Sequence, residues 1–142
     1  MVLFDVNVLV YAHRRDSQHH MACRRWLEGC INSDEAYGIS DFVLSAFIRI
    51  VTHPRIFKSP TRLEDALRFA AEVRSPANCV LITPAARHWE IYTRLCREAE
   101  VKGNLVPDAY RAALAIESGS EWITTDRDYA RFPGLRWRHP LN

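Results

Sequence analysis

The sequence predicts an α/β fold in which a parallel sheet carries helices on both faces. Short apolar runs at residues 2–11, 79–82 and 121–125 alternate with longer amphipathic segments, as in chains built from successive β-α units. Hydrophobic residues make up 48% and charged residues 25% of the chain, which is typical of a folded domain. A length of 142 residues predicts one domain over residues 1–142 and excludes a cofactor domain joined to a separate substrate domain.

The first half of the chain predicts two strands and three helices. Residues 2–11 are apolar and β-branched with two polar interruptions, so we expect a strand buried on both faces. The other elements expected in this half are a helix capped by Ser17 with apolar positions from 20 to 31, a short strand at 38–39, a helix capped by Ser40 or Asp41 that ends before Pro54, and a helix over 61–74.

The second half predicts further alternation of strands and helices. Residues 79–82 form an apolar run between turn formers, and Pro84 suits the first position of a long helix that extends to about Glu100. Pro107 is expected to open another helix through Ile116. A last major strand is expected at 121–125 and a short edge strand at 135–138.

Four aspartates stand where a parallel sheet places its functional groups, which is outside the carboxyl ends of strands or at the start of a neighbouring helix. They are Asp5, Asp108, Asp126 and Asp128. Each also has an ordinary structural interpretation: an ion pair for Asp5, a favourable helix dipole for Asp108, and a turn or helix cap for the last two.

Convergence of these acids would point to a metal centre. Carboxylates that gather in one pocket repel one another unless a divalent cation lies between them. A site with carboxylates and no histidine or thiolate favours Mg²⁺ or Mn²⁺ over zinc. Such ions activate water and neutralise the leaving oxygen in phosphodiester cleavage.

The cysteines and the N-terminal segment bear on the compartment. The four cysteines have no spacing suited to zinc and are interpreted as reduced thiols. The first apolar run contains an acid, so it predicts neither a signal peptide nor a membrane span. We therefore expect a cytoplasmic protein.

Three segments and one aspartate together carry a family resemblance. The segments are Leu3–Leu9, Val51–Phe57 and Thr125–Tyr129, and Asp108 lies between the last two. In this order and spacing they resemble a PIN domain and, more narrowly, the VapC ribonuclease toxins of bacterial toxin-antitoxin pairs. The resemblance covers essentially the whole chain. It implies a three-layer α/β/α arrangement around a mostly parallel sheet of four to five strands.

The resemblance also implies an activity and partners. Members of this family are Mg²⁺- or Mn²⁺-dependent endoribonucleases, usually homodimers, that are held inactive by a cognate VapB-type antitoxin whose C-terminal segment occupies the active-site groove. The residue roles that it implies are metal ligation by Asp5, Asp108 and Asp126, membership of the same acidic cluster for Asp128, and polar support from Asn7 and Thr125.

One acidic position of the family is missing. The family commonly carries a glutamate three residues before an arginine on its second long helix, and here Arg49 is preceded at that spacing by Ala46. Alanine cannot bind a metal. Either the site works with four aspartates, or Ser45 assists weakly, or this chain is catalytically impaired.

Contacts to RNA are expected from arginines near the acidic residues. The formal net charge is only +2, so the position of the basic groups matters more than their sum. The candidates are Arg14, Arg49 and Arg127. For each one alone, an ordinary surface ion pair is the plain alternative.

Two other functions remain open from the sequence. The first is a degenerate PIN domain that binds RNA or an antitoxin without cutting, and Ala46 is its support. The second is a haloacid-dehalogenase-like phosphatase with Asp5 as the phosphorylated nucleophile. Against the phosphatase, Asn7 stands where its second aspartate is expected, and the chain has two lysines.

Overall fold

A parallel sheet of five strands forms the centre of the computed structural model, which describes residues 1–142. The strands lie in the order β3-β2-β1-β4-β5 and every neighbouring pair is parallel. Their bounds are Val2–Phe4 (β1), Tyr37–Ile39 (β2), Cys79–Leu81 (β3), Glu121–Ile123 (β4) and Trp137–Arg138 (β5). The predicted α/β fold with a parallel sheet is confirmed, and the first strand of the chain is the central one.

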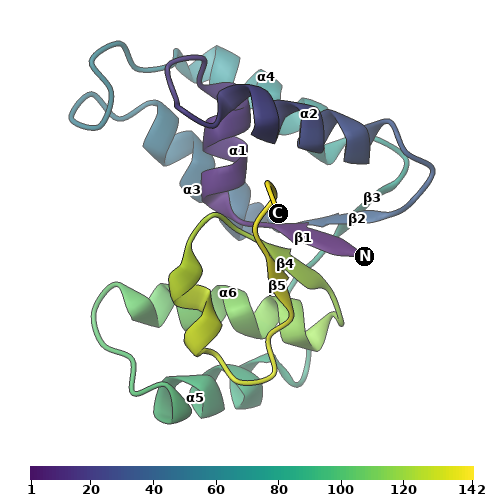
Figure 1. Cartoon of the computed structure of the whole chain (residues 1–142), viewed down its shortest axis with the longest axis vertical. Coiled ribbons are helices and arrows are strands. Elements are labelled where there is room, and N and C mark those ends of the chain that lie inside the picture. Colours follow the sequence, from purple (N-terminus) through teal and green to yellow (C-terminus); the bar gives the residue numbers. More distant parts are fainter.

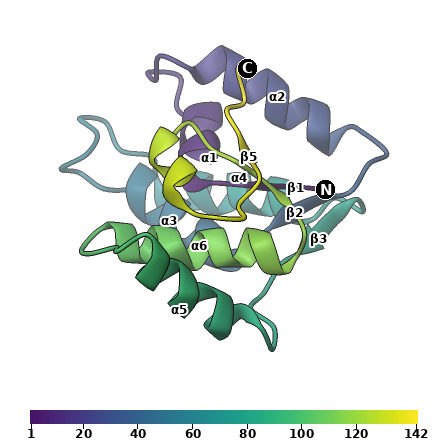
Figure 2. The same ribbon diagram turned by 60° about the horizontal axis from the view of Figure 1, so that its bottom comes forward.

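Helices cover both faces of this sheet. They are α1 (Val6–His13), α2 (His20–Ile31), α3 (Asp41–Val51), α4 (Leu63–Arg74), α5 (His88–Glu98), α6 (Leu105–Glu117) and a 3-10 turn at Arg127–Arg131. In Figures 1 and 2, α1 and α2 lie on one side of the sheet, and α5 and α6 lie on the other. No helix has both the length and the apolar character needed to cross a bilayer.

The predicted strand over residues 2–11 is wrong beyond Phe4. The chain turns at Asp5, whose extended backbone and side chain cap α1: its Oδ1 accepts a 2.7 Å hydrogen bond from the backbone N–H of Val6. Most of α1 is buried, so it has no polar stripe that would reveal a helical period. A short apolar run of this kind cannot be distinguished from a buried strand by periodicity.

The helix starts in the first half of the chain agree only in part with the predicted ones. Ser40 caps α3 as predicted, accepting a hydrogen bond from the backbone N–H of Phe42 at 3.2 Å. Ser17 does not cap α2, because its hydroxyl donates to the carbonyl of Arg14 at 2.7 Å and the helix begins at His20. The helix predicted over residues 61–74 is α4, which begins at Leu63, two residues after the predicted start.

The two helices of the second half also begin away from their prolines. The long helix predicted from Pro84 begins at His88, because the carboxylate of Glu117 accepts the N–H groups of Ala85 and Arg87 at 2.8 and 2.9 Å and holds this segment outside the helix. In contrast, α6 begins at Leu105, before Pro107.

One hydrophobic core of 29 buried residues surrounds the central strands. Phe4 contacts Trp26 of α2 edge-on, with ring centroids 5.4 Å apart. The hydroxyl of Tyr37 in β2 donates a 2.6 Å hydrogen bond to the carbonyl of Val73 in α4. These contacts fix β1 and β2 against the helices, and they therefore fix the carboxyl end of β1, where Asp5 stands.

Candidate active site

The ends of β1 and β4 are joined by one backbone hydrogen bond and by side-chain hydrogen bonds beyond it. The backbone N–H of Asp5 donates to the carbonyl of Ile123 at 2.9 Å. Beyond it, Oδ2 of Asp5 accepts hydrogen bonds from the hydroxyl of Thr124 at 2.7 Å and from Nδ2 of Asn7 at 3.2 Å. Asn7 also donates to Oγ1 of Thr124 at 3.1 Å. Asp5 is thus held in one orientation by Asn7 of α1 and by Thr124, the residue that follows β4.

Asp126 is bound to the same network. Its backbone N–H donates to Oγ1 of Thr124 at 3.0 Å. Its Oδ1 caps the 3-10 turn by accepting the N–H of Asp128 at 2.9 Å, and its Oδ2 accepts no hydrogen bond from the protein. Asp126 therefore keeps one carboxylate oxygen available to a ligand.

Asp108 lies on the first turn of α6, the helix that covers the other face of the sheet from α1. Its Oδ1 accepts hydrogen bonds from Nη1 of Arg111 at 3.1 Å and from the hydroxyl of Tyr129 at 3.3 Å. Its Oδ2 accepts none. Like Asp126, Asp108 is oriented by one oxygen and free at the other.

The three aspartates line one cavity of about 420 Å³. Two arginines, Arg49 and Arg111, line it as well. The remaining walls are Val6, Asn7, Val10, Tyr11, Ile50, Ile56, Phe57 and Tyr129. Three structural elements thus bring carboxylates together with two guanidinium groups.

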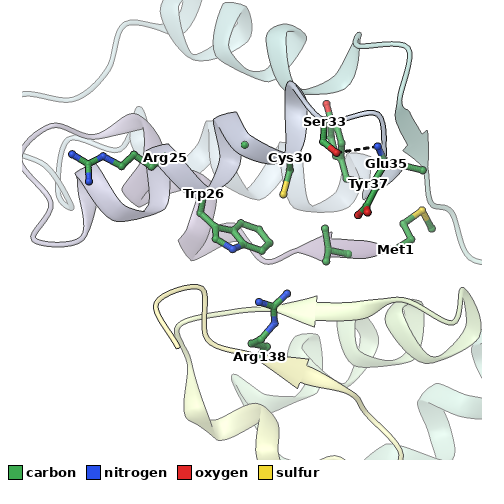
Figure 3. A pocket seen from close by; sticks show the side chains of 11 residues that line it. Met1, Arg25, Trp26, Cys30, Ser33, Glu35, Tyr37 and Arg138 are labelled. Atoms are coloured by element: carbon green, nitrogen blue, oxygen red, sulfur yellow. Dashed lines mark hydrogen bonds between the residues drawn. The ribbon is translucent and has the colours of Figure 1, made fainter.

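A larger cavity of about 710 Å³ lies elsewhere, between α2 and the sheet (Figure 3). Trp26, Cys30 and Tyr37 line it together with Arg138 from β5. It contains a single carboxylate, that of Glu35. Because chemistry on a phosphodiester needs several convergent charged groups, the smaller cavity is the candidate active site.

Burial perturbs two of the acids. It raises the pKa of Asp5 from 3.8 to about 6, although hydrogen bonds from Thr124 and Val6 and the charge of Arg111 act in the opposite direction. Burial also raises the pKa of Asp108, again against the charge of Arg111. The protein's own groups therefore compensate these negative charges only in part, and a cation in the cavity would be favoured.

The carboxylate oxygens that line the cavity are ligands of the type that a hard divalent cation prefers. Three carboxylates from separate elements share the cavity, and two of them have a free oxygen. No three Asp, Glu, His or Cys side chains lie close enough together to form a preformed metal cluster. The structure thus provides oxygen ligands of the right type without a closed coordination shell.

Comparisons with known proteins decide the family. The PIN domain profile matches residues 2–135. Two mycobacterial relatives, VapC ribonuclease Mb2897 of Mycobacterium bovis and ribonuclease VapC43 of Mycobacterium tuberculosis, are each 42% identical over 142 residues, which is 100% of this chain and 97% of theirs. The chain belongs to the VapC ribonucleases of the PIN-domain family.

Solved structures of this VapC fold agree. VapBC2 from Rickettsia felis, bound to a DNA fragment from its promoter, superposes with a TM-score of 0.72 at 23% identity and covers 98% of each chain. VapC20 of Mycobacterium tuberculosis, a sarcin-ricin loop cleaving toxin, superposes with a TM-score of 0.67 at 18% identity, over 96% of this chain and 99% of the other. The three-layer PIN architecture expected from the sequence is therefore confirmed.

Several residues that the VapC resemblance suggested lie outside the cavity. Asp128 is 62% exposed and pairs with Arg131 at 3.6 Å. Ser45 is exposed, and neither it nor Ala46 lines the cavity. Thr125 contributes only its backbone N–H, which donates to Oδ1 of Asn7 at 3.2 Å.

Of the three arginines predicted to bind RNA in this VapC protein, one lines the cavity and two do not. Arg49 lines the cavity. Arg14 is 10% exposed, and its guanidinium bonds both oxygens of Asp16 at 2.9 and 2.6 Å and the carbonyl of Ser59 at 2.8 Å. Arg127 is exposed beside Asp126 but does not line the cavity.

Three residues that hold the aspartates of this VapC site in place were not predicted from the sequence. Thr124, not Thr125, holds the network together, and it is completely buried. Arg111 follows Asp108 by three residues on α6, a spacing that brings helical side chains together and could have identified it. Tyr129 reaches Asp108 from the 3-10 turn, and no sequence spacing indicates that contact.

Proposed function

We propose that this PIN domain, residues 1–142, is a metal-dependent endoribonuclease that cleaves cellular RNA by attack of an activated water on a phosphodiester. The convergence of Asp5, Asp108 and Asp126 on one cavity with Arg49 and Arg111 carries the proposal. Relatives at 42% identity over the full chain are ribonucleases by name. The family match replaces the phosphatase alternative for Asp5.

The cofactor that we propose is Mg²⁺ or Mn²⁺, because the available ligands are carboxylate oxygens. Asp5, Asp108 and Asp126 would hold it. When bound, such an ion supplies an activated water and neutralises negative charge on the phosphodiester.

The protein's own groups would orient and bind. Thr124 and Asn7 fix Asp5, and Tyr129 and Arg111 fix Asp108, so the ligand oxygens are arranged before RNA arrives. The guanidinium of Arg49 lies at the cavity from an exposed position on α3. It is suited to hold a substrate phosphate by charge-assisted hydrogen bonds.

Two protein partners belong to the proposal. VapC-fold structures include VapBC complexes from Rickettsia felis and Salmonella typhimurium, and we propose that a VapB-type antitoxin covers this cavity. A homodimer would bury exposed aromatic side chains, of which Trp89 is 69% and Phe42 45% exposed. Light scattering on the purified chain would give the oligomeric state.

The decisive experiment uses antitoxin-free protein and total RNA from its host. Cleavage is expected with Mg²⁺ or Mn²⁺ and is expected to stop on chelation. Asp108→Asn should reduce cleavage by at least about a hundredfold, whereas Asp128→Asn, outside the cavity, should retain most of it. Equal cleavage in the presence of chelator would refute metal dependence.

The degenerate PIN domain remains the second candidate, because Ala46 provides no carboxylate. Wild-type protein would then bind RNA or antitoxin without cutting. Cleavage by Ala46→Glu and none by the wild type, with both folded, would establish that alternative.

A further inference from the structure

Arg111 is a permanent positive charge built into the acidic cavity. It lies one helical turn after Asp108 on α6, and its Nη1 is 3.1 Å from Oδ1 of that carboxylate. Its side chain is 16% exposed, and its Cζ lies 5.3 Å from the ring centroid of Phe42 on α3. Two elements therefore hold the guanidinium in place.

The bonds of Arg111 differ from those of a structural arginine. Its Nε is buried and has no hydrogen-bond partner, and Asp108 is its one hydrogen-bonded acceptor. Arg14 is similarly buried, yet it satisfies its donors with Asp16, Ser59 and Thr61. A buried guanidinium kept only for stability is expected to have its donors paired. Arg111 therefore lacks the hydrogen bonds that would offset the free-energy cost of burying its charge.

The charges of the cavity limit how many cations it can hold. Three carboxylates and two guanidinium groups line it. With all five ionised, the first divalent cation changes the formal charge from −1 to +1, and a second would raise it to +3. Repulsion of that kind is strong in a partly buried site, where water screens little.

We propose that Arg111 takes the place of a second metal ion, so that this cavity binds one divalent cation per chain. Asp5, Asp108 and Asp126 would hold the cation, while Arg111 stays paired with Oδ1 of Asp108. The inference rests on the proposed metal-dependent nuclease function, and it concerns the number of cations and the affinity for them.

Titration calorimetry with Mn²⁺ alone, on the full chain without antitoxin, tests this directly. The wild type should bind one ion per chain. Arg111→Gln should either bind a second ion or bind the first at least about tenfold more tightly, because a repelling charge is removed. Arg111→Lys keeps the charge and should retain the wild-type stoichiometry.

Arg131→Gln is the matched control. Arg131 pairs with Asp128 at the same spacing of three residues but outside the cavity, so Mn²⁺ binding should not change. Circular dichroism should show that each variant is folded, and Arg111→Met, which keeps the apolar stem, replaces the glutamine variant if that one unfolds.

The possible results separate the two proposals. Two ions bound to the wild type, or unchanged stoichiometry and affinity in the folded neutral variants, would overturn the role of Arg111 even if the wild type cleaves RNA. Absence of any Mn²⁺ binding by the wild type would overturn both proposals. One ion on the wild type with a gain in the neutral variants supports both the metal site and the role of Arg111.

Discussion

The hydroxyl of Thr124 donates a 2.7 Å hydrogen bond to Oδ2 of Asp5 across 119 residues of sequence. The same oxygen of Thr124 accepts the backbone N–H of Asp126 at 3.0 Å. One buried side chain therefore sets the position of two of the three acids. Its donor and acceptor functions are both used, so only another hydroxyl can replace it.

Thr124→Val should therefore damage stability and activity together. The substitution keeps the shape but removes the donor to Asp5 and leaves the N–H of Asp126 without its acceptor. We expect a loss of about 1–3 kcal/mol in the free energy of unfolding and at least about a tenfold loss of RNA cleavage. Chemical denaturation and initial cleavage rates measure these, and Thr124→Ser should restore most of both. An unaffected valine variant would remove Thr124 from the site.

Asp5→Asn should separate stability from activity. Burial raises the pKa of Asp5 from 3.8 to about 6, so the folded state binds this proton more tightly than the unfolded chain. The resulting stabilisation is fully present below about pH 4 and is lost as pH rises through about 6. At pH 7 without metal, the charged group costs on the order of 2–3 kcal/mol, which the amide avoids.

The measurement is unfolding free energy from pH 4 to 7.5 in chelator, for wild type and Asp5→Asn. The wild type should lose stability relative to the variant across this window, while the variant should not cleave RNA at any pH. A variant that is less stable by a constant amount at all pH values would instead identify Asp5 as a structural capping residue, because its Oδ1 also caps α1.

Tyr129→Phe tests how Asp108 is oriented. The hydroxyl of Tyr129 donates to Oδ1 of Asp108 at 3.3 Å from a buried position. Its removal should cost about 0.5–1.5 kcal/mol and lower cleavage up to about tenfold. Tyr37→Phe is the matched control, because its buried hydroxyl donates to the carbonyl of Val73 and Tyr37 does not line the cavity. The control should lose similar stability and no activity; equal activity losses would show a general effect of destabilisation.

Arg49→Gln should weaken RNA binding without changing the fold. Arg49 is on the surface, lines the cavity and takes part in no ion pair. We expect a higher KM, a smaller dependence of RNA binding on salt, and a change in stability below about 0.5 kcal/mol. Arg74→Gln, which breaks an exposed pair with Asp41, should leave the KM unchanged. An unchanged KM in Arg49→Gln would remove it from the substrate path.

The parts of this structure that follow from local sequence were predictable. The positions of Asp5, Asp108 and Asp126 after strands or at a helix start led to one cavity, because the ends of parallel strands meet at one edge. The capping of α3 by Ser40 was also predicted. In each case the residue type and its immediate neighbours contain the information.

The parts that depend on distant contacts were not predictable. Whether Thr124 or Thr125 joins Asp5 depends on where β4 ends, a matter of one residue. Asp128 was grouped with the other acids, but the 3-10 turn directs it outward to Arg131. The late start of α5 depends on Glu117, about thirty residues away.

The pairing of β1 with β4 has a consequence for synthesis of this protein. Asp5 leaves the ribosome 119 residues before its partner Thr124, and the third acid, Asp126, follows Thr124. The cavity cannot close on a growing chain. Translation products that stop before β4 would therefore lack both Thr124 and Asp126, and they would contain no complete cavity.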